Sequence, residues 1–462
     1  MRILDVSARL ALGLVAAAVV GCNDGSVNPI TTNPTLDQQV RQAISPWGVV
    51  PLLPVAAPDP ALVDLGRSLF FDKILSGNRD VACATCHDPR NGTDDGRSLA
   101  IGTGAIGTGT TRTLGAGRSV TPRNAPALFS VGLGAFYLFW DGRVTDGNGI
   151  GGRFATPAGT ALPGGVANMV AAQAMFPVTN RTEMRGNVGD RDVFGNANEL
   201  AVPGDSAFAA IWKATIARVL AVSAYVQKFN AAYPGIPTSQ LGFEHAANAI
   251  AAFEVASFSK TGSPFDRYLS HDDGALTPDA KRGALLFFGK AGCVSCHSGP
   301  LLGGQQFASS GVPQIGPGVS PSAPLDAGRG DVAVSGGGPP QSGRFTFRVS
   351  PLRNVELSAP YMHDGVYSTL EAVVRHYNNV DSALKAFDPT QLDASLRASY
   401  HGDAATIAAV EKSLDFRVQR ALALTADEQA QLVAFLKSLT DPAARNLGAL
   451  VPGSVPSGLP LP

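Results

Sequence analysis

The sequence has few charged residues and no long uninterrupted apolar segment. Only 16% of its 462 residues are Asp, Glu, Lys or Arg, and the formal net charge is −1. An average soluble protein has about 25% charged residues. Because Lys and Arg form no block, the composition argues against a nucleic-acid partner. No stretch reaches the roughly 18 apolar residues of a membrane-spanning helix. The length supports two or three domains with their own cores.

Cysteine is also scarce, and the five cysteines are an odd number that cannot all pair within one chain. The first, Cys22, follows an apolar run at residues 10–21 behind Arg2 and Arg9. This pattern is typical of a signal peptide, and its last letters, V-V-G-C, resemble a bacterial lipobox. We expect a lipoprotein signal peptide and lipid attachment at Cys22, with ordinary signal cleavage as the alternative. Either way the protein is exported; the lipobox places it in the periplasm, anchored at a membrane surface.

The other four cysteines lie in two identical C-x-x-C-H motifs. This motif is the attachment signature of c-type haem, in which both thiols bond the haem and the adjacent imidazole ligates iron. A zinc site or a redox dithiol is the competing interpretation. Zinc would need both motifs brought together, and a dithiol leaves the repeated histidine unexplained. We therefore expect two covalently bound haem c groups. Their binding residues are Cys83, Cys86 and His87 in the first motif and Cys293, Cys296 and His297 in the second.

The segments that precede the two motifs also repeat. Asp59-Pro60 and Thr277-Pro278 each supply an N-cap residue and a proline at the first helical position. They predict helices that run to Phe71 and Phe288 and deliver the chain to each motif. The fold class is therefore mainly α, with two tandem cytochrome c-like domains, one haem in each, and long irregular loops. Further helices are predicted within residues 206–229, 244–258 and 425–436.

Glycine and proline, with 52 and 33 residues, gather in long loops such as 92–117 and 141–165. Connections of this length are usually functional or mobile. The predicted division of the chain is a signal peptide at 1–21, a flexible tether at 22–50, an N-terminal haem domain at 51–265, a C-terminal haem domain at 266–440 and a tail at 441–462.

Five further motifs accompany the haem signatures. They are R-N-A-P at residues 123–126, F-W-D-G-R at 139–143, P-F-D-R-Y at 264–268, L-R-N-V at 352–355 and A-P-Y-M-H-D-G at 359–365. In this order, the motifs resemble those of the bacterial di-haem cytochrome c peroxidase and MauG superfamily. The resemblance implies a periplasmic electron-transfer oxidoreductase that reacts with hydrogen peroxide. In that superfamily, MauG matures a tryptophan-derived quinone in a partner protein, and MbnH oxidises a tryptophan on a companion protein.

The resemblance assigns roles around the first haem. His87 is then the proximal ligand of the haem that meets peroxide, and its domain is the peroxidatic one. Gln173 and Glu183 match the distal glutamine and glutamate, of which the carboxylate takes a proton from peroxide and returns it to the leaving oxygen. Trp140 matches a tryptophan that relays electrons between the haems. Taken alone, Glu183 is equally well explained as a surface carboxylate, and Trp140 as a core residue.

The resemblance also implies one calcium ion between the domains. Its ligands match Asn124, Ser358 and the carbonyl group of Pro360. Oxygen ligands suit calcium, although the family commonly has threonine where Ser358 stands.

Two departures concern the axial ligands of the irons. Well-studied cytochrome c peroxidases carry a distal histidine after the first motif, whereas no histidine occurs here between residues 88 and 244. At the C-terminal haem, these peroxidases place a methionine fourteen residues beyond the position of His363. Tyr377 stands there instead, and MauG-type members use a tyrosine at this position as the axial ligand. Met362 is the alternative to Tyr377 as this ligand. The remaining possibility is that His376, or no residue at all, ligates the iron at this position.

A third departure separates the sequence from MauG itself. MauG has a tryptophan two residues before its second haem motif, where this chain has Ala291. The route by which electrons leave a partner must therefore differ from that in MauG. The sequence is also compatible with an MbnH-like branch of the superfamily.

Three functions remain after this reading. The first is a di-haem peroxidase that forms high-valent haem iron with hydrogen peroxide and oxidises a Trp or Tyr side chain of an exported partner protein. The second is a peroxide-scavenging cytochrome c peroxidase that uses a small electron-donor protein. The third is a non-catalytic di-haem electron carrier. We expect the first.

Overall fold

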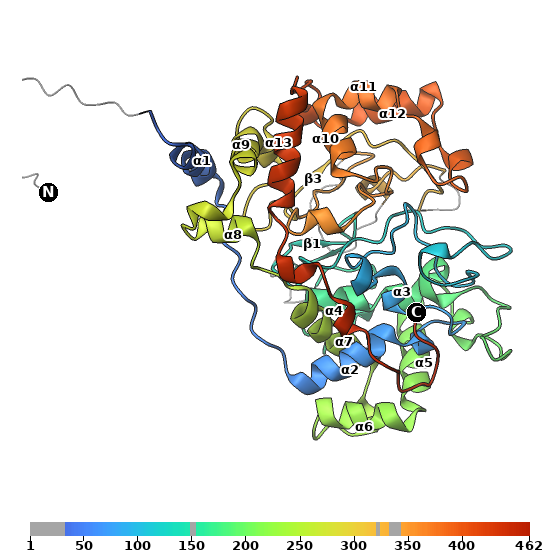
Figure 1. Ribbon diagram of the computed structural model, residues 1–462. Coiled ribbons are helices and arrows are strands. Elements are labelled where there is room, and N and C mark those ends of the chain that lie inside the picture. The colour runs from blue at the N-terminus through green and yellow to red at the C-terminus, as the bar shows by residue number, and fades with distance from the viewer. Residues whose placement is uncertain (1–32, 148–153, 320–323, 332–342) are drawn as a thin grey trace, which may run out of the picture. The chain divides into compact units, whose positions relative to one another are not determined.

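The computed structural model describes residues 33–147, 154–319, 324–331 and 343–462. Residues 36–462 form one compact unit, which is described below. The predicted signal peptide and Cys22 lie outside the described residues. Regular structure in this unit is mostly helical, as expected for the mainly α class, and long irregular segments connect the helices (Figure 1).

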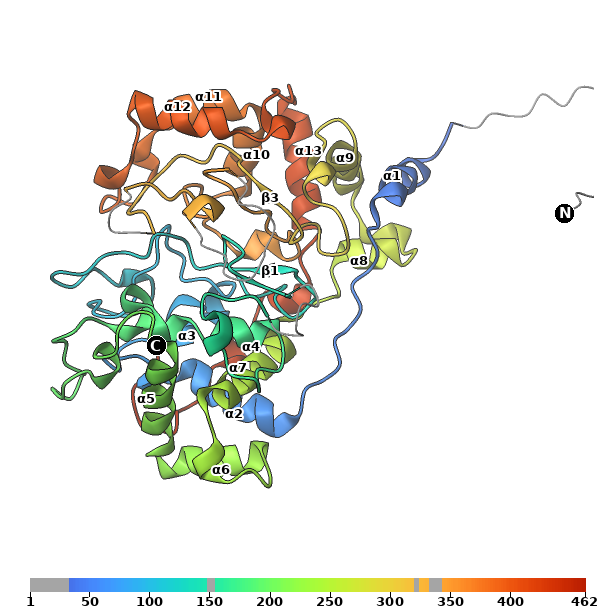
Figure 2. The same ribbon diagram turned by 180° about the vertical axis from the view of Figure 1, so that it is seen from behind.

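Five helices from the first half of the chain gather around one apolar cluster, at the end of the unit opposite α10–α13 (Figures 1 and 2). Helix α2 begins as predicted, because the Asp59 carboxylate accepts hydrogen bonds from the backbone of Ala61 and Leu62 and Pro60 occupies the first position. Helices α2 and α7 cross closely at Gly66, where an added Cβ would lie 1.8 Å from the Ala249 carbonyl oxygen. The helices are α2 (Pro60–Phe71), α4 (Met169–Ala174), α5 (Phe208–Leu220), α6 (Ser223–Ala232) and α7 (Phe243–Phe258).

A second large cluster lies among helices of the second half. Thr277 caps α9 through its hydroxyl group, and Thr425 and Glu428 form the predicted capping box of α13. Helices α9 and α13 cross at Gly283, where a Cβ would lie 2.0 Å from the Gln431 carbonyl oxygen. The helices are α8 (Pro264–Leu269), α9 (Pro278–Phe288), α10 (Leu370–Asn378), α11 (Val380–Lys385), α12 (Ala404–Ser413) and α13 (Ala426–Lys437).

The repeated segments of the sequence therefore pack in the same way. Gly66 and Gly283 each stand five residues before the last phenylalanine of their helix, and each lets a second helix approach its backbone. The predicted boundary between domains at residue 265 remains a prediction, although the two apolar clusters draw mainly on the two halves of the chain.

Strands are short and lie between the two helical groups (Figure 1). Strand β1 (Tyr137–Leu138) pairs antiparallel with β2 (Val144–Thr145), and β3 (Phe307–Ala308) pairs antiparallel with β4 (Phe347–Arg348). The β1–β2 hairpin carries Trp140 in its turn, so this small element positions a predicted site residue.

The structure differs from the predicted flexible tether at residues 22–50. Helix α1 (Leu36–Ile44) packs against α9 and buries Val40 and Ile44 in the second cluster. Salt bridges from Asp37 to Lys281 and from Arg41 to Asp273 fix it further. The helix forms because its apolar residues recur every four positions and find a partner surface.

The predicted tail at residues 441–462 crosses to the opposite group of helices. Val455 and Leu459 are buried in the first cluster, and the Ser457 hydroxyl donates to Asp72 at 2.6 Å. Figures 1 and 2 both show the C-terminus beside α5.

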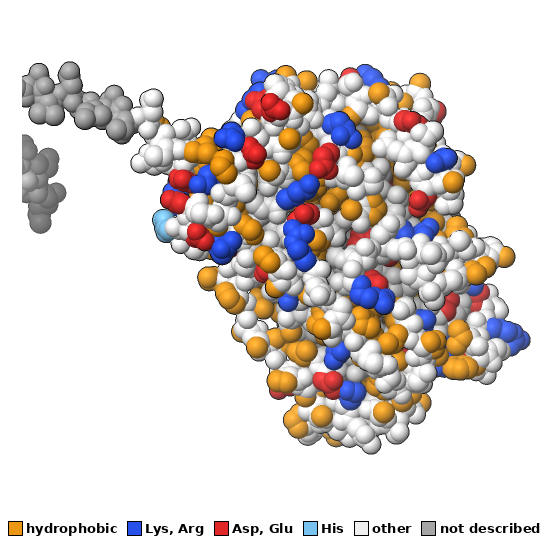
Figure 3. All heavy atoms as spheres, viewed as in Figure 1, with side chains coloured by type: hydrophobic (Ala, Val, Ile, Leu, Met, Phe, Trp, Pro, Cys, Tyr) orange, Lys and Arg blue, Asp and Glu red, His pale blue; other side chains and the backbone are white. Residues whose placement is uncertain are grey.

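Among the described residues, no single helix has the length and apolar character to span a membrane. Helices α5 and α6, which meet at 105°, are together long and apolar enough to do so as a bent pair, judged by length and composition alone. On the face shown in Figure 3, acidic and basic side chains are interspersed among apolar ones.

Candidate active site

The first C-x-x-C-H motif forms a single helical turn, α3 (Cys83–Cys86), that ends at His87. The His87 backbone N–H donates to the Cys83 carbonyl at 2.9 Å, which closes the turn. The imidazole Nδ1 lies 3.2 Å from the carbonyl oxygen of Thr93. Because a carbonyl only accepts, Nδ1 carries the proton, and the Nε2 lone pair is left for a metal.

The second motif repeats this arrangement with different spacing. His297 closes the turn η11 (Cys293–Ser295) by donating to the Cys293 carbonyl at 2.9 Å, and its Nδ1 lies 2.9 Å from the Leu302 carbonyl oxygen. Thr93 and Leu302, the two acceptors, both adopt positive φ angles, of 62° and 52°. Such hydrogen bonds fix the ring orientation of metal-binding histidines.

The chemistry of both motifs fits covalent haem. The four motif cysteines form no disulfide with one another, and burial raises the pKa of Cys83 and of Cys293 to about 12. Burial also lowers the pKa of His87 and His297 to about 4, so both imidazoles are neutral and able to ligate iron. Among the described residues, no three His, Cys, Asp or Glu side chains come together as a metal site, which speaks against zinc held by both motifs.

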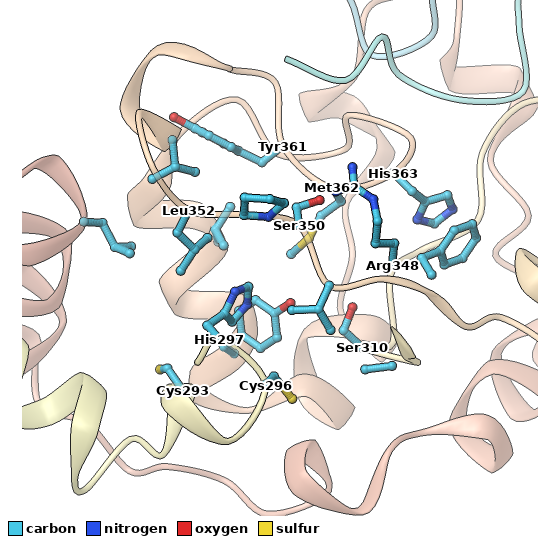
Figure 4. A pocket seen from close by; sticks show the side chains of 18 of the residues that line it. Cys293, Cys296, His297, Ser310, Arg348, Ser350, Leu352, Tyr361, Met362 and His363 are labelled. Carbon is cyan, nitrogen blue, oxygen red and sulfur yellow. The ribbon is translucent and has the colours of Figure 1, made fainter. Parts of the chain in front are cut away.

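A cavity of about 270 Å³ adjoins the second motif. Figure 4 shows Cys293, Cys296 and His297 on one side of it, with Met362 and Arg348 extending from the other side. Most of its lining is apolar, as a haem pocket requires.

Two of the three candidate axial ligands of the C-terminal haem line this cavity. Tyr377, on α10, lies near the thiols of the second motif, and burial raises its pKa to about 12. Met362 enters from the segment before β-bridge residue Tyr367. Both ring nitrogens of His376 are occupied, by Tyr367 and by the Ser310 carbonyl. The geometry therefore leaves Tyr377 and Met362, and the choice of Tyr377 stays a prediction.

Glu183 faces the first motif. It lies in the short turn η7 (Arg181–Arg185), where Asn180 caps its backbone N–H and its carbonyl accepts from Thr103 at 2.9 Å. Its negative charge raises the pKa of Cys86, which places the carboxylate near that thiol. Burial raises the pKa of Glu183, while the charges of Arg143 and Arg123 oppose this.

Gln173 lies on the helix that precedes η6 (Pro177–Thr179). It is half-buried in the last turn of α4. Four residues later the chain enters η6, which packs against η7. Gln173 is therefore one element removed from Glu183 along the chain, and its place beside the first motif stays a prediction.

Trp140 lies at the cavity of the second motif. Its indole N–H donates to the Asn124 carbonyl at 2.9 Å, and its own carbonyl accepts from the backbone of Arg348 at 2.7 Å. The next residue, Asp141, is fully buried and pairs with Arg123 at 2.5 Å and Arg143 at 2.9 Å. These bonds hold the indole at a fixed place on the cavity wall.

The three predicted calcium ligands, Asn124, Ser358 and Pro360, line the same cavity. The Asn124 side-chain N–H donates to the Arg97 carbonyl at 2.8 Å, which leaves the amide oxygen available. The backbone N–H of Asn124 donates to the His363 carbonyl at 2.8 Å, so the two predicted ligand segments are tied together. This oxygen-donor set fits calcium.

Sequence reasoning missed two buried charged residues beside these sites. Arg348 lines the cavity, and burial lowers its pKa to about 10. Glu254, on α7, lies near Cys83, and burial raises its pKa to about 8. Each could have been found in the sequence as a single charged residue within a mostly apolar segment. These segments are F-T-F-R-V at 345–349 and A-A-F-E-V at 251–255.

A family model described as di-haem cytochrome c peroxidase matches residues 60–274. The chain is 31% identical over 320 residues to the methylamine utilization protein MauG of Methylorubrum extorquens, with 69% of each protein covered. It is 32% identical over 315 residues to the cytochrome c551 peroxidase of Pseudomonas aeruginosa, with 67% of this chain and 70% of that protein covered. The chain belongs to the di-haem cytochrome c peroxidase family.

Solved structures agree with this assignment. A MauG-like protein associated with microbial copper homeostasis superposes with a TM-score of 0.56 at 27% identity, over 86% of this chain and 94% of that one. The diheme peroxidase BthA from Burkholderia thailandensis shares the fold, with a TM-score of 0.54 at 21% identity, over 86% of this chain and 93% of that one. This di-haem peroxidase is therefore an enzyme of a family whose name implies two haems, and it has one C-x-x-C-H motif for each.

Proposed function

We propose that this di-haem peroxidase uses hydrogen peroxide to oxidise a Trp or Tyr side chain of an exported partner protein. His87 and His297 would each hold the iron of one haem, and Tyr377 would bind the iron of the C-terminal haem as a further ligand. Trp140 relays electrons between the two haem sites. The residues that act on peroxide itself are Gln173 and Glu183.

The absence of a histidine in the segment after the first motif carries this proposal. No histidine lies between residues 88 and 244 to ligate this iron from the distal side. The carboxyl group of Glu183 lies near Cys86 instead. A peroxidase that must be half-reduced before it reacts needs a blocking ligand that reduction removes. We therefore expect the holoenzyme to react with peroxide without prior reduction.

The residues of the first site then handle the protons. When bound, haem supplies the iron that cleaves peroxide and stores oxidising equivalents. The Glu183 carboxylate would take a proton from one oxygen of peroxide and give it to the other, which would depart as water. Because burial raises the pKa of Glu183 toward the working pH, the group is a stronger base than an exposed carboxylate and still an effective acid.

The residues of the second site favour storage of oxidising equivalents. A tyrosine oxygen is an anionic donor that stabilises higher oxidation states of iron, whereas methionine raises the potential and favours ferrous iron. Tyr377 at this cavity therefore suits a centre that holds an oxidising equivalent until a partner arrives. The hydrogen bonds of Trp140 and of its neighbour Asp141 keep the relay in place.

Peroxide scavenging with a small electron-donor protein is the second candidate. The similarity to a cytochrome c551 peroxidase favours it. A non-catalytic carrier is less well supported, because it needs two strong axial ligands on each iron and the first site offers no distal histidine.

Electron paramagnetic resonance of the resting holoenzyme separates these functions. We expect one high-spin and one low-spin ferric signal, both lost when peroxide is added without reductant. Two low-spin signals, or a strict need for half-reduction, would return the protein to the scavenging peroxidases or to the carriers. Slow turnover with reduced cytochrome c and oxidation of a Trp or Tyr in a co-purifying exported protein complete the test.

The proposal includes a periplasmic location, a lipid anchor at Cys22 and one calcium ion held by Asn124, Ser358 and Pro360. Metal analysis of the purified holoenzyme checks the calcium. Recovery with membranes that is lost in Cys22→Ser checks the anchor.

A further inference from the structure

The C-terminal haem cavity is connected to the surface by a chain of aromatic side chains. Tyr377 lines the cavity, and its ring centroid lies 5.3 Å from that of His376. His376 lies 5.3 Å from Tyr367, which lies 6.1 Å from Phe387. Phe387 lies 5.2 Å from Tyr400. His376, Tyr367 and Phe387 are buried, and Tyr400 is half-buried.

The hydrogen bonds within this chain define which atom carries the proton. The His376 Nε2 lies 2.7 Å from the Ser310 carbonyl oxygen. A carbonyl only accepts, so Nε2 carries the imidazole proton and Nδ1 has a free lone pair. The Tyr367 hydroxyl lies 3.0 Å from that Nδ1 and therefore donates to it. Tyr367 is thus a buried phenol whose proton already points at a base.

We infer that Tyr367 is a redox-active residue and that it passes oxidising equivalents from the C-terminal haem site to a partner protein at Tyr400. This inference rests on the proposed function and names the exit route that the replacement of the MauG tryptophan by Ala291 leaves open. Because an oxidised phenol is a far stronger acid than an imidazolium ion, its proton moves along the 3.0 Å hydrogen bond to His376.

Each step balances in electrons and protons. Tyr367 gives one electron to the oxidised haem site while its hydroxyl proton moves to His376 Nδ1, which leaves a neutral phenoxyl radical beside an imidazolium ion. Tyr400 then gives one electron to Tyr367 across Phe387 and releases its own proton to solvent, while the proton on His376 returns to Tyr367. A Trp or Tyr side chain of the partner finally gives one electron and one proton to Tyr400. Phe387 is a bridge only, because its ring has no ionisable group.

The end of the chain is held in a defined position. Tyr400 forms an isolated β-bridge with Ile315, and its ring packs on Gly402 so closely that an added Cβ there would lie 2.3 Å from the ring. An ordered, half-buried tyrosine at the end of a buried aromatic chain is a suitable point for contact with another protein.

Tyr233 provides a control in the other group of helices. It is half-buried, stacks on Phe229 at 6.3 Å and contacts His245 edge-on at 4.9 Å. Its hydroxyl, however, donates to the backbone carbonyl of His245 rather than to a ring nitrogen. Tyr233 therefore has the aromatic neighbours of Tyr367 but no base for its proton.

The test treats the two-haem enzyme with peroxide in the presence of a nitroso spin trap and without a partner, and maps the adducts by peptide mass spectrometry. We expect an adduct at Tyr400 in the wild type and in Tyr233→Phe, and its loss in Tyr367→Phe and in Phe387→Leu. Freeze-quench electron paramagnetic resonance should show a tyrosyl radical in the first two proteins only. The decay of the oxidised state should slow in deuterium oxide in the wild type and lose this solvent effect in Tyr367→Phe.

The outcomes separate the relay from the function on which it rests. If the wild type forms its oxidised state and Tyr367→Phe and Phe387→Leu still give the Tyr400 adduct, the chain is core packing and the relay is wrong. Unchanged haem spectra in both variants show that they are folded, and Phe387→Leu leaves the hydrogen bond of Tyr367 intact. If the adduct pattern is as expected but no partner side chain is oxidised, the proposed function and the delivery to a partner fail, while the path through Tyr367 to Tyr400 stands. If peroxide does not react with the wild type, both fail.

Discussion

The imidazoles of His87 and His297 show how single residues prepare a haem site. Each donates its Nδ1 proton to a backbone carbonyl, of Thr93 and of Leu302, and both acceptors adopt a left-handed backbone. The acceptors stand six and five residues after their histidines. No sequence rule connects these spacings, because the path of each loop decides which carbonyl reaches the ring. The candidate ligands therefore come from the motifs alone, whereas the carbonyl groups that orient them could be found only from the structure.

Glu183 allows a direct test of the peroxide chemistry at the residue scale. Glu183→Gln keeps the size of the side chain and removes the proton acceptor. We expect both haems and the fold to be retained and the reaction with peroxide to slow by roughly 10²–10⁴-fold, the usual contribution of general acid–base catalysis. Stopped-flow absorbance after mixing with peroxide measures this rate. An unchanged rate would show that Glu183 is not the proton shuttle.

The pH dependence of the same rate gives the sign of the effect. Burial raises the pKa of Glu183, so the active carboxylate forms at a higher pH than in an exposed glutamate. The rate should therefore rise with pH through this raised pKa in the wild type and be flat over that range in Glu183→Gln. Glu371→Gln, at an exposed carboxylate paired with Lys437, is the control and should keep the wild-type profile.

At the scale of elements, the sequence predicted where helices begin better than it predicted which helices pack against each other. Asp59-Pro60, Thr277-Pro278 and the capping box at Thr425 begin helices α2, α9 and α13 as predicted. Helix α1 was missed and read as part of a tether. Its stability comes from burying Val40 against α9, and such tertiary packing leaves only a short pattern in the sequence.

At the glycine of each main helix crossing, we predict that substitution by alanine destabilises the protein instead of stabilising it. Alanine in place of a helical glycine usually stabilises by about 0.5–1 kcal/mol. At Gly66 and Gly283 the added Cβ would lie 1.8 Å and 2.0 Å from a backbone carbonyl oxygen, which cannot move without separating the helices. We expect Gly66→Ala and Gly283→Ala each to lower the free energy of unfolding by about 1–3 kcal/mol, as overpacking does.

Denaturant unfolding of the holoenzyme measures these changes. Gly204 is the matched control, because an added Cβ there meets nothing within 4 Å and its φ is not positive. Gly204→Ala should stay within about 0.5 kcal/mol of the wild type. Equal effects at Gly66, Gly283 and Gly204 would contradict the close crossings.

At the scale of the whole unit, the two ends of residues 36–462 cross over. The first helix, α1, packs on α9 of the second half of the chain. The last residues, 447–459, pack into the cluster formed mainly by the first half. Each half of the chain is therefore completed by a segment from the far end of the sequence. The buried pair of Arg123 with Asp326 adds a further link between segments far apart in the sequence. The haem sites lie in a scaffold that these links hold together.

Leu459 tests whether the C-terminal segment is part of the core of the first half. Its side chain is 7% exposed, so Leu459→Ala removes buried apolar volume and should lower the free energy of unfolding by about 2–3 kcal/mol. Leu53→Ala is the control, because Leu53 lies in an irregular connecting segment but is 79% exposed, and it should change the stability by less than about 0.5 kcal/mol. Thermal unfolding followed at the haem absorbance and by circular dichroism compares the two variants. If both variants unfold like the wild type, the last residues of the chain are not part of this core. A loss confined to Leu459→Ala shows that the last residues of the chain belong to the first apolar cluster, where the structure places Leu459.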